Sequence, residues 1–164
     1  MMRQDENALL EKYLRAWPPL VDREVTDGAE RLVMEIEGDE FPIALLRNAA
    51  PKTCDAFVRK LPLKGEFIHA AWSGDVIRML DSFELPEIKD FENGTYYLAP
   101  GDVCYTLGHK EFTIIYGDCD PRMPYGAVRE VVFGIICERL KDFQKVGRLI
   151  RVAGARKFTI KKEK

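Results

Sequence analysis

The sequence predicts a mainly β protein: a closed β-barrel with two short helices, preceded by an additional helix near the N-terminus. Short runs of β-branched and aromatic residues recur along most of the chain, and Gly, Pro, Asn or Asp separate them roughly every 8–12 residues. Apolar residues at helical spacing are confined to a few segments. Many short strands with few and short helices are typical of a barrel.

The composition fits one globular domain of moderate size. Of the 164 residues, 46% are hydrophobic and 32% are charged, which excludes a wholly disordered chain. No apolar run approaches the ~20 residues of a membrane-spanning helix, so we expect no role in a membrane. We expect a helical extension over residues 1–30 and the barrel domain over residues 31–164.

The first expected element is an amphipathic helix over residues 5–17, which Pro18 and Pro19 end. We expect its apolar stripe to dock on its own barrel or on a neighbouring subunit, since acidic residues on the same helix would repel anionic lipid. The stripe consists of Leu9, Leu10, Tyr13, Leu14 and Trp17.

The first half of the barrel is expected to begin with two strands, 31–37 and 41–47, joined by a Gly38-Asp39 turn. A short helix follows, with Pro51 in its first turn. Residues 66–72 and 75–81 then form a hairpin around Ser73 and Gly74, and an acidic loop covers residues 82–95.

The second half is expected to contain short strands with a long loop between them and a helix near the end. The loop covers residues 117–126, which are rich in Gly and Pro. The helix covers residues 140–147. The expected strands are 95–98, 102–106, 112–116, 128–137 and 157–162.

The charge balance argues against a dedicated nucleic-acid-binding protein, because the net charge is −2 and the pI is about 5.8. Residues 139–164 are nevertheless basic, with ten Lys and Arg against two acidic residues. No aromatic residues alternate with these charges as in single-strand binders, so we interpret them as a solvated helix and edge strand. A phosphate- or RNA-contacting tail is the alternative.

The four cysteines, Cys54, Cys104, Cys119 and Cys137, contain no C-x-x-C pair. The first residues lack the apolar stretch of a secretory signal. We therefore expect a cytoplasmic protein with reduced thiols.

Several motifs resemble cyclophilins. Ala-Pro-Lys-Thr at 50–53, followed by Phe57, is similar to the cyclophilin helix opening, with Ala56 in place of the usual Asn. Val-Val-Phe-Gly at 131–134 resembles a cyclophilin strand. Segments 61–65, 68–75 and 99–105 look more like the prokaryotic cyclophilin-like proteins of unknown function, and the likeness covers residues 31–162.

The resemblance implies a cyclophilin-like barrel but does not imply prolyl isomerase activity. In isomerases of this family an Arg follows a Phe-His pair, whereas His69 is followed here by Ala70. The family's Gln-Gly-Gly is also missing. A rearranged isomerase site that uses Arg78 is the alternative.

The predicted hairpin supplies an independent candidate site. A two-residue turn at Ser73-Gly74 would place His69 directly opposite Arg78 on the outer face, together with Phe67. Two opposed cations favour a neutral His or an anion bound between them. The alternative is that Arg78 pairs with a structural carboxylate and His69 lies in a subunit interface.

A second cluster follows in the 105–125 region. A metal site at His109, Glu111, Asp118 and Asp120 is possible but is not expected, because the chain has two histidines and no established metal motif. We interpret residues 116–125 as a loop at the rim of the ligand pocket.

We therefore expect a homo-oligomer that binds a small anionic ligand or peptide on the outer barrel face, with no cofactor and no metal. A purely structural oligomer module is a further alternative. No catalytic residues are assigned. The candidate ligand-binding residues are Phe67, His69, Arg78, Tyr105, Tyr116, Asp118, Arg122 and Tyr125.

Overall fold

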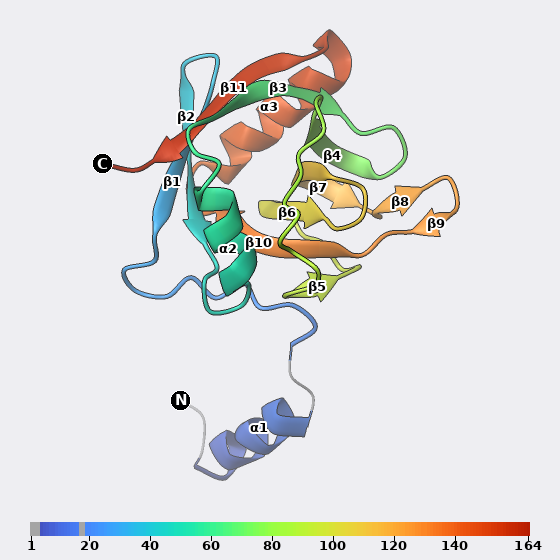
Figure 1. Cartoon of the computed structure of the whole chain (residues 1–164). Helices are drawn as coiled ribbons and strands as arrows, with labels where there is room; N and C mark the ends of the chain where they lie inside the picture. Colours follow the sequence, from blue (N-terminus) through green and yellow to red (C-terminus); the bar gives the residue numbers. More distant parts are fainter. Residues whose placement is uncertain (1–3, 17–18) are drawn as a thin grey trace.

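The computed structural model describes residues 4–16 and 19–164 and is mainly β (Figure 1). The helices of this part are α1 (Gln4–Ala16), α2 (Pro51–Val58) and α3 (Leu140–Ala153). The longer strands are β1 (Arg31–Ile36), β2 (Asp39–Leu45), β3 (Leu63–His69), β4 (Gly74–Met79), β6 (Asp102–Thr106), β7 (Glu111–Cys119), β10 (Glu130–Ile136) and β11 (Arg156–Lys162). Three two-residue strands are β5 (Gly94–Thr95), β8 (Arg122–Met123) and β9 (Gly126–Ala127).

The eight longer strands of the described chain close into an antiparallel barrel, as the sequence predicts. Their order is β2-β1-β11-β3-β4-β7-β6-β10, and β10 pairs back onto β2 to close the ring. β5 adds to the edge of β10, and β8 pairs with β9 as a separate small hairpin. Closure leaves none of the eight strands with a free edge along its whole length.

The two helices of the barrel domain cover opposite ends of the barrel (Figure 1). The ring of Phe57 on α2 packs against Phe112, near the start of β7, with 5.1 Å between the ring centroids. At the other end of β7, Tyr116 lies against Gly147 of α3, where a Cβ atom would come within 2.3 Å of the Tyr116 ring. Both helices therefore bury apolar faces, and the interior between them contains phenylalanine rings packed among aliphatic side chains.

Several predicted elements are confirmed with shifted boundaries. β6 has the predicted bounds, whereas β3 begins three residues earlier than expected and α3 continues to Ala153. The expected strand over 95–98 shortens to β5. β7 runs to Cys119, and the expected loop over 117–126 contains the β8–β9 hairpin.

The helix α1 does not dock on the barrel as predicted, because all of its side chains from Asp5 to Ala16 are exposed. The stripe residues Leu9 and Tyr13 are 68% and 52% exposed. Docking on a neighbouring subunit stays a prediction, and Trp17 and Pro18 lie outside the described residues. Within the described part of the chain, no helix is long and apolar enough to cross a membrane.

Residues 19–30 run along the outside of the barrel and are fixed to it by Arg23. Its guanidinium donates two hydrogen bonds of 2.7 Å to the carboxylate of Asp102, which is 1% exposed. Asn93 adds a reciprocal pair of hydrogen bonds with the backbone of Asp22. The first strand, β1, begins at Arg31, and the division into an extension over residues 1–30 and a barrel domain over residues 31–164 stays a prediction. The four cysteines, all in the described chain, are free.

Candidate functional site

The predicted pairing of His69 with Arg78 is wrong. In the β3–β4 hairpin, His69 pairs with Ile77, and Arg78 pairs with Ile68. Since successive side chains of a strand point to opposite faces, this shift of one residue turns the whole of β3 over relative to the expectation. Ile68 and Arg78 face outward together, and His69 faces the interior side.

The cause is the length of the reversal. Four residues, Ala70 to Ser73, separate the two strands, and the backbone N–H of Ala70 donates to the carbonyl of Val76. Gly74 has a φ of +83°, and a Cβ there would lie 2.6 Å from the carbonyl oxygen of Asp118. The hairpin is therefore centred on Ser73 instead of between Ser73 and Gly74, and Gly74 lies close to the backbone of β7.

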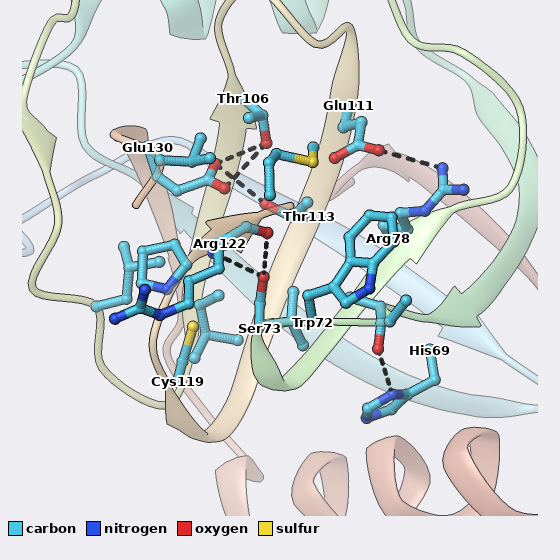
Figure 2. A pocket seen from close by; sticks show the side chains of 18 of the residues that line it. His69, Trp72, Ser73, Arg78, Thr106, Glu111, Thr113, Cys119, Arg122 and Glu130 are labelled. Carbon is cyan, nitrogen blue, oxygen red and sulfur yellow. Dashed lines mark hydrogen bonds and ion pairs between the residues drawn. The ribbon is translucent and has the colours of Figure 1, made fainter. Parts of the chain in front are cut away.

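The imidazole of His69 is engaged within the protein instead of facing Arg78. Its Nδ1 lies 2.8 Å from the carbonyl oxygen of Ala70, and its Nε2 lies 2.8 Å from the hydroxyl of Tyr116. Figure 2 shows the ring turned toward α3. Both ring nitrogens thus have partners within the protein, and His69 borders the cavity described below without pairing with Arg78.

A cavity of about 190 Å³ does exist on the outer wall, on the side to which Arg78 points (Figure 2). Its floor consists of outward side chains of β3, β4, β7, β6 and β10. The turn before Gly74 and the segment 121–123 form its rim. Most of the lining is apolar, and this part comprises Ile68, Ala70, Ala71, Trp72, Val76, Leu98, Ile115, Pro121, Met123 and Val128.

The polar part of the floor is centred on the carboxyl of Glu130, which is 6% exposed. The hydroxyl of Thr106 donates to this carboxyl, with Oγ1 at 3.0 Å from Oε1 and 2.8 Å from Oε2. The hydroxyl of Thr113 lies 3.4 Å from Oε2. Burial raises the pKa of Glu130 to about 7, with the two hydroxyls opposing this shift and the nearby carboxylate of Glu111 adding to it.

Arg78 and Glu111 form an ion pair beside this floor, with 3.5 Å between Nη1 and Oε1. The same Nη1 donates to the carbonyl of Met79 at 3.1 Å. The side chains of Arg78 and Glu111 are 30% and 20% exposed, so both remain accessible from the cavity. The alternative in which Arg78 pairs with a carboxylate is thus what the structure shows.

The rim is held together by Ser73 and Arg122. The Ser73 hydroxyl accepts from the backbone N–H of Arg122 at 3.0 Å and donates to its carbonyl at 3.1 Å. The Arg122 guanidinium pairs with Asp120 at 2.6 Å. Trp72 lies next to these residues and is 59% exposed, so its indole ring presents a flat apolar surface at the mouth of the cavity.

The structure separates the remaining predicted site residues. Phe67 and Tyr105 lie in the core at 0% and 2% exposure, and Phe67 stacks on Phe158. Tyr116 is also fully buried, and burial raises the pKa of its hydroxyl. Asp118 and Tyr125 are exposed and do not line the cavity, and Tyr125 contacts His109. Of the eight predicted residues, His69, Arg78 and Arg122 border the cavity.

The sequence interpretation missed Glu130, Thr106 and Thr113. Glu130 is the first residue of β10, whose other residues are mostly β-branched or aromatic and mostly buried, and a charge at the start of such a strand is a signal that could have been used. The two threonines carry no comparable signal, because threonine is common on strands.

A metal site is not formed at His109 and its acidic neighbours. Within residues 4–16 and 19–164, no group of three or more His, Cys, Asp or Glu side chains comes together in a way that could hold a metal ion. The thiol of Cys119 borders the cavity, but burial raises its pKa to about 12, so it stays protonated at neutral pH.

Comparison with known proteins places the chain among proteins of unknown function. A family model described as a protein of unknown function (DUF3830) matches residues 32–162. None of the curated proteins matches the chain.

Two solved structures resemble the fold. The structure of McbB in complex with tryptophan is 13% identical, with a TM-score of 0.64, over 80% of this chain and 44% of McbB. The chain thus spans less than half the length of McbB. The solution structure of the hypothetical protein AF2241 from Archaeoglobus fulgidus is 21% identical, with a TM-score of 0.54, over 87% and 98% of the two chains. These likenesses support the barrel fold, and the resemblance to cyclophilins stays a prediction.

Proposed function

This chain belongs to the DUF3830 family of proteins of unknown function, and we propose that it binds, in the outer-wall cavity, a small molecule that joins an apolar body to a carboxylate. The observation that carries the proposal is the cavity itself, which combines apolar walls with an accessible guanidinium at one side. Small-molecule sites are typically concave and mostly apolar, with a few polar groups that fix orientation.

The apolar body of the ligand is expected to lie on the floor formed by Val76 and Ile115, between the wall and Trp72. Both residues are nearly fully buried, at 4% and 1% exposure, whereas the indole of Trp72 is largely exposed. A ligand ring placed against Trp72 would bury apolar area of both partners.

The carboxylate of the ligand is expected to bind Arg78. A guanidinium has five N–H donors, and the contacts of Arg78 in the described chain are one hydrogen bond to a backbone carbonyl and the 3.5 Å ion pair with Glu111. It therefore retains donors for a bidentate contact with a carboxylate. The proposal therefore retains the anionic ligand and the role of Arg78 that the sequence predicted, but it gives His69 no role in binding.

Calorimetry with 4-ethylbenzoate tests the proposal. This probe joins an apolar aromatic body to one carboxylate. We expect it to bind the protein and to raise the melting temperature. Arg78→Gln is expected to weaken binding about tenfold or more, because a charge-assisted contact is lost. The matched control is Arg59→Gln, since Arg59 pairs with Glu87 on the surface away from the cavity.

Two results would overturn the proposal. One is the absence of binding by 4-ethylbenzoate and by related aromatic acids, which would favour a structural oligomer module. The other is equal binding by Arg78→Gln and the control. A proline-peptide isomerisation rate that disappears in Arg78→Gln would support the isomerase alternative instead.

A further inference from the structure

We propose that the ligand of this cavity also carries a basic nitrogen, which binds the carboxyl of Glu130, at the end of the ligand remote from its carboxylate. The ligand class is thus an amphipathic molecule with a cationic amine at one end, an apolar body, and a carboxylate at the other end. The inference rests on the proposed function, because it uses the same cavity and the same contact with Arg78.

The first argument is that Glu130 lacks the partner that a buried carboxyl usually has. Buried acidic side chains are normally paired with a cation or a metal. The contacts of Glu130 in the described chain are the hydroxyls of Thr106 and Thr113, and no ion pair is formed. A cationic group of a ligand in the cavity would supply the missing partner.

The second argument is the sign of the charges around Glu130. The titratable groups that interact with it are Glu111 on β7 and the thiols of Cys104 and Cys119 on β6 and β7. Burial raises the pKa of both thiols, so they are neutral at neutral pH. The charged neighbour is therefore the carboxylate of Glu111, which is paired with Arg78, and an ammonium beside Glu130 would offset the repulsion between the two carboxyls.

The third argument is the hydrogen-bond geometry. The Thr106 hydroxyl lies within 3.0 Å of both carboxyl oxygens, and donation from a hydroxyl favours the ionised form of the carboxyl. Both oxygens keep further lone pairs, since an ionised carboxylate accepts about four hydrogen bonds. The site is thus prepared for a charged Glu130 once a cation is present.

The register of the wall sets the spacing of the two ligand ends. Arg78 on β4 pairs with Thr113 on β7, which pairs with Cys104 on β6, and Cys104 pairs with Val132 on β10, two residues from Glu130. Three strand spacings of roughly 4.8 Å separate the two backbones. The Glu130 carboxyl reaches across β6 to Thr113 on β7, so the gap between the two charged groups is shorter than that between the backbones. Figure 2 shows Glu130 and Arg78 at different sides of the cavity, so we expect the amine and the carboxylate to lie at opposite ends of the apolar body of the ligand.

The test compares 4-(aminomethyl)benzoate with 4-ethylbenzoate, which has a methyl group in place of the ammonium. Calorimetry at pH 6 in two buffers of different ionisation enthalpy gives both the affinity and the protons released. We expect the amine probe to bind about tenfold more tightly or better. We also expect it to release about one proton, because Glu130 is mostly protonated at pH 6 in the free protein and ionises beside the ammonium.

Glu130→Gln is expected to remove both the preference for the amine and the proton release. The matched control is Glu84→Gln, since Glu84 pairs with Lys110 on the surface. The proton release is measured on the unmodified protein, so the inference can be tested even if Glu130→Gln folds poorly.

The outcomes are distinguishable from those of the proposed function. If both probes bind equally and no proton is released, the inference is wrong and the proposed function stands. The inference is also wrong if Glu130→Gln keeps the preference for the amine. If neither probe binds, the proposed function fails, and this inference fails with it.

Discussion

Two buried carboxyl groups lie on the outer wall of the same barrel, and their surroundings differ. Asp102 on β6 and Glu130 on β10 belong to paired strands and are 1% and 6% exposed. Asp102 accepts two hydrogen bonds from Arg23 and one from the backbone N–H of Ala99. Glu130 is bonded to threonine hydroxyls and lines a cavity.

This contrast indicates which buried carboxyl is structural and which is accessible to a ligand. A carboxylate removed from water is destabilising unless a cation and hydrogen bonds compensate. Arg23 compensates Asp102 and fixes residues 19–30 to the barrel, and the hydrogen bond to Asp102 raises the pKa of Arg23. Glu130 has no such partner in the described chain, so its pKa rises to about 7.

The largest expected effect is a loss of stability when Asp102 loses its cationic partner. Arg23→Ala would leave Asp102 buried without a cation, and we expect the free energy of unfolding to fall by about 3 kcal/mol. Urea denaturation followed by circular dichroism measures this change.

The control for this variant is Arg59→Ala, which removes an exposed ion pair with Glu87 and is expected to cost less than about 1 kcal/mol. If the free energy of unfolding falls equally in the two variants, Arg23 stabilises the buried Asp102 no more than an exposed ion pair would. Asp102 and Glu130 would then not differ in the way described above.

The next effect concerns Glu130, and it has the opposite sign, because replacing this carboxyl is expected to increase stability. The carboxyl has a pKa of about 7 in the folded chain against an ordinary value of 4.5, so between these pH values the folded state holds a proton that the unfolded state has released. Stability due to this group therefore falls as pH rises from 4.5 to 7. We expect Glu130→Gln to match the original protein near pH 4 and to be more stable at pH 8, by on the order of 3 kcal/mol.

Thermal unfolding of both proteins from pH 4 to pH 8 measures how their difference in stability changes with pH. Glu84→Gln serves as the control, since it replaces a carboxyl that is about half exposed and pairs with Lys110 on the surface. A Glu130→Gln variant that is less stable than the original protein at pH 8 would contradict a buried carboxyl without a cation.

The smallest effect concerns the hydroxyl that partly compensates Glu130. Thr106→Val removes the donor within 3.0 Å of both carboxyl oxygens, and we expect a loss of about 1 kcal/mol at pH 8. Because the hydroxyl lowers the pKa of Glu130, its removal should also move the pH-dependent fall in stability upward.

The same pH series, recorded on Thr106→Val and on a Thr159→Val control on β11, checks this expectation. Thr159 lies on a strand that is not part of the cavity floor. If the transition in Thr106→Val stays at the original pH, the Thr106 hydroxyl does not interact with an ionised Glu130.

Local pattern predicted most of the barrel. The β-branched run of β10 and the bounds of β6 were readable because strands need a repeat of two and turn residues at their ends. In β4 the predicted faces were also right, with Ile77 buried and Arg78 partly exposed. The pattern of β3 was assigned to the wrong faces, because the assignment depended on the length of the following turn and not on the strand.

The candidate site was less predictable than the fold. Arg78 was identified for a partner, His69, that faces another direction, and Glu130 was missed. The reason is that a site on a barrel wall combines residues from β4, β7, β6 and β10, which are adjacent in space but far apart along the chain. The register of the paired strands decides which of these residues lie side by side on the same face of the wall. A shift of one residue in the register moves a side chain to the opposite face.

The alternation of apolar and polar residues in short strands was enough to predict a barrel, because burial of apolar side chains requires that alternation. It did not indicate that Asp102 would meet a guanidinium while Glu130, among the described residues, would not. Whether a buried carboxyl has a cation depends on which distant side chains closure of the barrel brings beside it, since electrostatic compensation acts over a few ångströms in space and not along the chain.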